Sequence, residues 1–202
     1  MPQVIDRSLN RKSLKFLIGL LAIISPLMHV AGDVMKLLNN NLLSVPQLLL
    51  TYASFMLLPL AVVGIFSLYW DRLGWFGLVG TVLYSVAFIY FATTAMTPFT
   101  HMRSEIVAGN VSFSHLSDIF GQPYVIHGIL MTIGGILFGG AILLSKTLPK
   151  LTGALLIFGV IINVIFTIYP VGPFFIIGAI IRNGAFILMG LYLITLKERS
   201  YS

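Results

Sequence analysis

Several polar side chains of this chain stand within long apolar stretches, where they are costly unless they have a partner or a function. Arg182 is the clearest case, because it lies eight residues, or about 12 Å along a helix, from Phe174 at the start of its stretch. An arginine near the middle of a membrane helix costs about 2.5–3.5 kcal/mol on insertion scales. The residues that we expect to form one polar pocket are His29, Asp33, Tyr52, His127, Asn163, Arg182 and Asn183.

His29 and Asp33 are four residues apart, so both side chains lie on one face of a helix. We expect Arg182 to point into the protein and to contact His29 or Asp33, with Asn163 supplying a further hydrogen bond. Two other interpretations remain open. Arg182 either extends its side chain to the outer membrane surface, or it forms a purely structural ion pair with Asp33.

A second group of ionisable residues lies in the longest connection, residues 97–122. Within it, the apolar residues of Ser112–Phe120 are spaced as in an amphipathic helical turn that lies at a membrane surface. The sequence predicts a short helix here, which covers the outer mouth of the protein. The ionisable residues of this connection that we expect near the mouth are His101, Glu105, His115 and Asp118.

The histidines and carboxylates do not follow a metal-binding pattern. The chain has four histidines and no cysteine, and it contains neither HExxH nor another close pair of histidines. A glycine-rich phosphate loop and a haem-ligating motif are also missing. The sequence therefore predicts no metal and no other cofactor.

The elements that carry these residues are six apolar stretches. About 20 residues of helix cross a hydrocarbon core of roughly 30 Å, and each stretch approaches or exceeds that length. With 58% hydrophobic and only 9% charged residues, the composition excludes an ordinary soluble domain. We predict an all-α, polytopic bundle of six transmembrane helices, a single domain over residues 1–202, with an amphipathic segment in the outer loop between the third and fourth helices. The predicted spans are residues 14–35, 48–70, 73–96, 124–145, 151–169 and 174–196.

Basic residues are distributed unequally between the two sides of this bundle. Two of them, Lys36 and Arg103, fall on one side, and Arg182 lies inside a span. The other nine fall on the opposite side: Arg7, Arg11, Lys12, Lys15, Arg72, Lys146, Lys150, Lys197 and Arg199. The positive-inside rule then places both termini in the cytoplasm, and we expect a bacterial cytoplasmic membrane. Because the net charge of +6 flanks the spans and forms no basic face, a nucleic-acid partner is not expected.

The polar residues gather in the half of the bundle away from the termini. The inner half offers mainly Ser67, Tyr84 and Ser85, and nothing in it is ionisable. We therefore expect an outward-facing polar pocket for a small molecule or a lipid, in a sensor, accessory or transport role. One alternative is a membrane-embedded enzyme that acts on a lipid-like substrate through the histidine and carboxylate cluster, and another is a structural partner subunit. The oligomeric state is not predicted.

Overall fold

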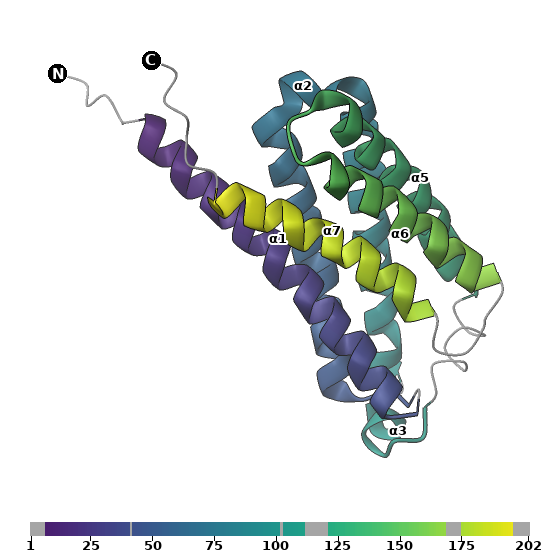
Figure 1. The fold of residues 1–202 in the computed structure, drawn as a ribbon. Helices are drawn as coiled ribbons and strands as arrows, with labels where there is room; N and C mark the ends of the chain where they lie inside the picture. Colours follow the sequence, from purple (N-terminus) through teal and green to yellow (C-terminus); the bar gives the residue numbers. More distant parts are fainter. Residues whose placement is uncertain (1–6, 41, 102, 112–120, 169–174, 196–202) are drawn as a thin grey trace.

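The computed structural model describes the chain except residues 1–6, 41, 102, 112–120, 169–174 and 196–202 (Figure 1). In this described part, the regular secondary structure is helical and no strand occurs, which confirms the all-α prediction. The helices are α1 (Arg7–Leu38), α2 (Val45–His101), α3 (Arg103–Val107), α5 (Gly121–Ser145), α6 (Lys150–Ile168) and α7 (Phe175–Thr195).

Helix α2 consists of two arms that fold back on each other. The backbone leaves helical geometry at Tyr69 (φ −134°, ψ 22°) and at Gly74 (φ 59°, ψ −159°), and the second of these conformations is open essentially to glycine alone. In a straight helix, Phe55 and Phe88 would lie roughly 50 Å apart, yet their ring centroids are 5.2 Å apart. Residues 45–68, the first arm, therefore run antiparallel to residues 75–101, the second arm.

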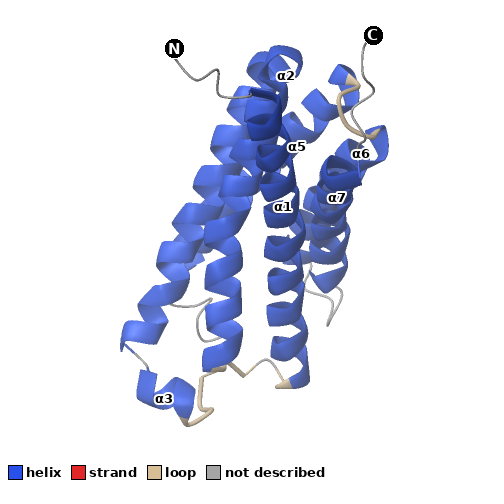
Figure 2. Ribbon diagram, turned by 90° about the vertical axis from the view of Figure 1, so that its left-hand side faces the viewer, coloured by secondary structure: helices blue, strands red, loops and turns tan. Residues whose placement is uncertain are grey.

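The long helices form a closed ring in chain order. Helix α1 contacts α2, α2 contacts α5, α5 contacts α6, α6 contacts α7, and α7 returns to α1. At this last contact Gly19 lies opposite Ile194, and His29 lies opposite Asn183, so α1 and α7 run antiparallel. The start of α1 and the end of α7 consequently lie at the same end of the protein, here called the terminal end (Figures 1 and 2).

Glycines allow the helix backbones to approach closely around the ring. A Cβ atom on Gly134 of α5 would lie 2.5 Å from the backbone nitrogen of Tyr84 in the second arm. A Cβ on Gly159 of α6 would lie 2.5 Å from the backbone nitrogen of Arg182 in α7. Small residues at such contacts are typical of helix packing in membranes, where van der Waals contact takes over from the hydrophobic effect.

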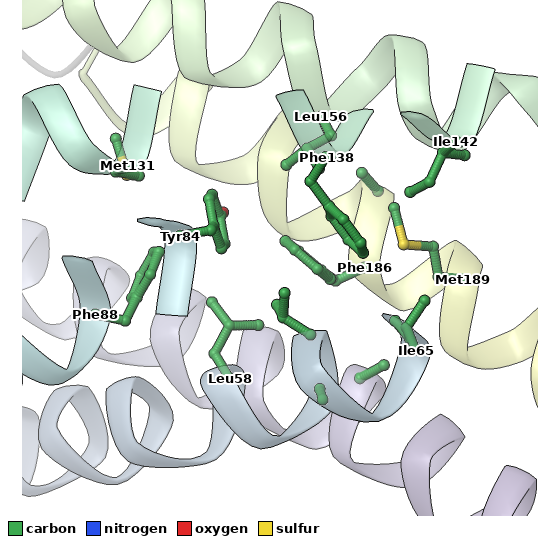
Figure 3. Packing of buried hydrophobic residues seen from close by; sticks show 14 of the residues in the cluster. Leu58, Ile65, Tyr84, Phe88, Met131, Phe138, Ile142, Leu156, Phe186 and Met189 are labelled. Atoms are coloured by element: carbon green, nitrogen blue, oxygen red, sulfur yellow. The ribbon is translucent and has the colours of Figure 1, made fainter. Parts of the chain in front are cut away.

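The terminal half of the ring is filled by an apolar core. Figure 3 shows side chains from α2, α5, α6 and α7 meeting at its centre. Phe138, Phe186 and Met189 are completely buried there, and Leu58 and Ile65 pack against them from the first arm. The cavity described below lies in the opposite half.

In the part of the chain that the structure describes, four helical segments are long and apolar enough to cross a membrane: Arg11–Leu38, Val45–Thr93, Val125–Ser145 and Ile176–Thr195. The described apolar part of α6, Lys150–Ile165, is shorter. These lengths are compatible with a membrane protein. The second of the four segments contains both arms of α2, which correspond to the predicted spans 48–70 and 73–96.

The predicted boundaries need two corrections. Helix α1 continues to Leu38, beyond the predicted end at residue 35, because no helix-breaking residue follows Asp33 until the turn at Asn39 and Asn40. Residues 97–101 belong to α2, and α3 follows, so the first part of the predicted loop is helical. There Ile106 and Val111 are buried against Leu43 and Leu48, beside the connection from α1 to α2. The predicted helix over 112–120 lies outside the described residues.

Candidate functional site

A cavity of about 490 Å³ occupies the half of the ring away from the terminal end. All five long helices contribute to it, and polar and apolar residues line it in equal number, although most of the lining surface is apolar. From α1 and α2 the lining residues are His29, Asp33, Lys36, Gln47, Thr51, Phe55 and Phe91. From α5, α6 and α7 they are Val125, His127, Gly128, Ile129, Met131, Thr132, Ile133, Asn163, Val164, Ala179 and Arg182.

Five of the seven predicted pocket residues line this one cavity, namely His29, Asp33, His127, Asn163 and Arg182. Asn183 stands just behind it, and its Nδ2 lies 3.3 Å from His29 Nδ1. Tyr52 does not line the cavity. It packs against the apolar core, and its neighbour Thr51 faces the cavity instead.

The predicted residues of the outer loop are not brought to the cavity by the described structure. Glu105 lies on α3, exposed to solvent and outside the cavity lining. His101 is the last residue of α2, and its side chain is not described. His115 and Asp118 lie outside the described residues.

Arg182 is buried at the inner end of the cavity, with only 2% of its surface exposed. Its Nη2 donates to His29 Nδ1 over 3.3 Å, and its Nη1 contacts Met131 Sδ at 2.7 Å. The guanidinium carbon also lies 5.4 Å from the centre of the Phe88 ring, a distance at which an aromatic face attracts a cation. Arg182 thus meets α1 at His29, as one of the predictions stated, and the interpretation in which it extends to the membrane surface is wrong.

The surroundings of His29 fix its tautomer. Both Arg182 Nη2 and Asn183 Nδ2 are hydrogen-bond donors, and both point at His29 Nδ1. Nδ1 must therefore be the acceptor, so the ring proton sits on Nε2. Nε2 lies 3.6 Å from Asp33 Oδ2. His29 consequently stands between the cation and the carboxylate, and the predicted direct pair of Arg182 with Asp33 is replaced by a chain of three groups.

His127 has the opposite tautomer. Its Nδ1 lies 2.8 Å from the backbone carbonyl of Ala87, which can only accept a hydrogen bond, so Nδ1 carries the proton. The ring also stacks on Phe91, with the centroids 4.4 Å apart. His127 is therefore held firmly, and its Nε2 offers a lone pair.

Lys36 belongs to the cavity, although it was not among the predicted pocket residues. It is 6% exposed and lines the cavity three residues beyond Asp33 and seven beyond His29, on the same face of α1. The i, i+4, i+7 spacing of these three residues was a signal in the sequence. It was missed because the span was predicted to end at residue 35.

The cavity opens sideways between α5 and α6. Gly128, Thr132, Gly135 and Gly139 of α5 are spaced i, i+4, i+7 and i+11, so they form one stripe along the helix. A Cβ on Gly135 or on Gly139 would touch Val160 or Ile157 of α6, whereas a Cβ on Gly128 would meet no atom within 4 Å. Among the described residues, this stripe thus passes from close contact with α6 at Gly135 to the cavity lining at Thr132 and Gly128.

The outer face of α5 takes part in this opening. Ile129 and Ile133 line the cavity while 54% and 46% of their surfaces are exposed. The lining thus extends from His127 and Met131 inside the ring, around the Gly128 flank of α5, to the side of the protein. In the described residues the cavity has a buried polar end at Arg182 and an apolar side opening.

Among the described residues, no group of three histidine, cysteine, aspartate or glutamate side chains is placed to hold a metal ion. Comparison of the chain with protein-family models, with curated proteins and with solved structures finds no match.

Proposed function

We propose that this chain is a single-domain, six-span protein of the bacterial cytoplasmic membrane, which binds a small molecule or a lipid in an outward-facing pocket. The six spans are α1, the two arms of α2, α5, α6 and α7. The ring arrangement supports this count, since each segment packs antiparallel to its neighbours and the start of α1 lies on the same side as the end of α7.

The observation that carries the proposal is the cavity itself. Residues from every long helix converge on it, and a buried arginine stands at its inner end, next to a histidine and an asparagine. Ionisable groups within membrane helices mark functional sites by default, and a cavity of this size falls in the range of roughly 300–1,000 Å³ that is typical of ligand pockets.

A binding role is favoured over the two alternatives. Both ring nitrogens of His29 face partners in the protein, Arg182 and Asn183 on one side and Asp33 on the other, so this histidine is not free to act as a base on a substrate. A purely structural subunit would not need an open cavity, which is destabilising relative to packed side chains.

Gly128→Leu provides a test, because it fills the side opening without displacing packed atoms. Gly140→Leu is the matched control, since it adds the same side chain to the same helix, also in open space but outside the cavity. After incubation with a total bacterial extract and purification in a nonionic detergent, native mass spectrometry should show a bound molecule on the wild type and on Gly140→Leu. We expect occupancy of Gly128→Leu to be about tenfold lower. Equal occupancy of all three proteins, or no bound molecule on any of them, would contradict the proposed function.

The orientation is tested separately with reporter fusions. Because nine basic residues flank the terminal end, we expect alkaline phosphatase fused after Ser202 to be inactive and a fluorescent protein at the same place to fluoresce. A fusion at Asn110, on the opposite side, should give active phosphatase. Active phosphatase at Ser202 would reject the topology.

A further inference from the structure

Arg182 has more hydrogen-bond donors than the protein satisfies. A guanidinium carries five N–H groups, and the hydrogen-bond acceptors placed on it among the described residues are a thioether sulfur and an imidazole nitrogen. Both are uncharged, and sulfur is a weak acceptor. The Nε–H is buried and has no hydrogen-bond partner in the described structure. A buried cation with an unsatisfied donor is expected to meet an anion or an acceptor that is not part of the chain.

The charges that line the cavity are unbalanced in the same direction. Among the described lining residues, Arg182 and Lys36 are basic, Asp33 is the single acidic residue, and His29 and His127 are the other ionisable groups. Lys36 lies about 10 Å further along α1 than His29, towards the outer end, whereas Arg182 marks the inner end. A negatively charged group is therefore favoured at the inner end of the cavity, beside Arg182.

Apolar residues of the lining lead to the side of the protein. Phe55 and Phe91 face the cavity from α2, and Ile129, Ile133 and Val164 line it at the opening between α5 and α6. In a membrane this opening faces lipid chains. A ligand that binds from water does not require an opening towards lipid. A ligand that is already dissolved in the bilayer can enter the cavity through this opening.

We propose that the cavity binds an anionic amphiphile with one oxyanion head, a carboxylate or a phosphate, and one acyl chain, which it takes from the surrounding bilayer. The head pairs with the guanidinium of Arg182, which lines the cavity, and the chain passes Thr132 and Gly128 and lies against Ile129, Ile133 and Val164. This assignment rests on the proposed function and adds the class of ligand to it.

The test compares head and chain separately. Protein in nanodiscs of zwitterionic phospholipid is titrated by calorimetry with laurate, dodecyl phosphate, dodecanol and acetate at pH 8. Empty nanodiscs of the same phospholipid serve as the blank for partition into lipid. We expect at least one of the two anionic amphiphiles to bind at least tenfold more tightly than dodecanol, because a hydrogen bond to a charged group is worth that factor or more. Acetate, which has the head without the chain, should not bind measurably.

Two variants keep the outcome interpretable. Arg182→Met should bind the anionic amphiphile at least tenfold more weakly than the wild type. Gly128→Leu should also bind it more weakly, because the leucine blocks the path of the acyl chain. Gly140→Leu should bind it as the wild type does. Because Gly128→Leu leaves every charge in place, it tests the route even if Arg182→Met does not fold.

Failure of this proposal differs from failure of the proposed function. If dodecanol binds as tightly as the anionic amphiphiles, the anionic class is refuted while the pocket remains. If acetate alone competes with laurate for the site, the ligand is a water-soluble anion and the route through the bilayer is refuted. If none of the four compounds binds and the molecule carried by the purified protein has no oxyanion, the anionic class is refuted and the ligand-binding function stands.

Discussion

Gly134→Leu is expected to prevent the protein from reaching its folded state, or to destabilise it by more than about 3 kcal/mol, the upper end of the usual effect of overpacking. The Cβ alone would lie 2.5 Å from the backbone nitrogen of Tyr84 and 2.9 Å from its Cα. Backbone atoms cannot rotate out of the way as a side chain can. Helix α5 and the second arm would therefore have to separate, and the buried contacts of Tyr84 and Phe138 would be lost with them.

Gly140→Leu again provides the matched control, because a Cβ at Gly140 meets no atom within 4 Å. Thermal unfolding in detergent, followed by the loss of helical circular dichroism and by size-exclusion profile, should leave this variant within a few degrees of the wild type. Equal melting temperatures of Gly134→Leu and the wild type would show that the close contact between α5 and the second arm does not exist.

The second large effect concerns the pair of Arg182 and His29. We expect His29→Leu to destabilise the protein by about 2–3 kcal/mol, since Arg182 and Asn183 would both lose their acceptor inside the protein. Arg182→Met should change stability far less, because a methionine fills a similar volume without a buried charge. The double variant should therefore recover most of the stability that His29→Leu alone loses.

This cycle is measured as the free energy of unfolding in a denaturing detergent titration. A similar loss for both single variants, added together in the double variant, would contradict the coupling between the two residues. A tolerated Arg182→Met would also mean that the arginine contributes little to stability. Its presence at the inner end of the cavity then calls for a functional reason, which ligand binding supplies.

Much of the cavity could be predicted from sequence because polar residues are rare in these helices. Where a stretch of about 20 residues contains a single arginine or asparagine, the cost of exposing that group to lipid directs it towards the interior. The meeting of Arg182 with His29 followed from this cost and from their similar depth. The depth of a residue depends only on the helical rise of 1.5 Å per residue, so it can be read without knowing how the helices pack.

The remaining features depend on how each helix is rotated about its axis and on where it ends. The sequence of an apolar helix specifies both of these poorly. Thr51 and Tyr52 are adjacent and equally deep, and only the packing of the first arm decides that Thr51 faces the cavity while Tyr52 joins the core. Lys36 fell just outside the predicted span, which was placed at residues 14–35, although the helix continues to Leu38. The passage from contact with α6 to the cavity lining has no sequence signal of its own, since Gly128 and Gly135 look alike in the stripe and differ only in what faces them.

The return of α7 to α1 also sets an order of events during synthesis. His29 and its donor Arg182 are 153 residues apart, so at roughly 5–20 residues per second the ribosome makes them about 8–30 s apart. During that interval α1 presents His29, Asp33 and Lys36 without the two residues of α7 that complete the site. A nascent chain that stalls before α7 therefore leaves this polar face uncovered, and the site is complete only when the last helix has been made.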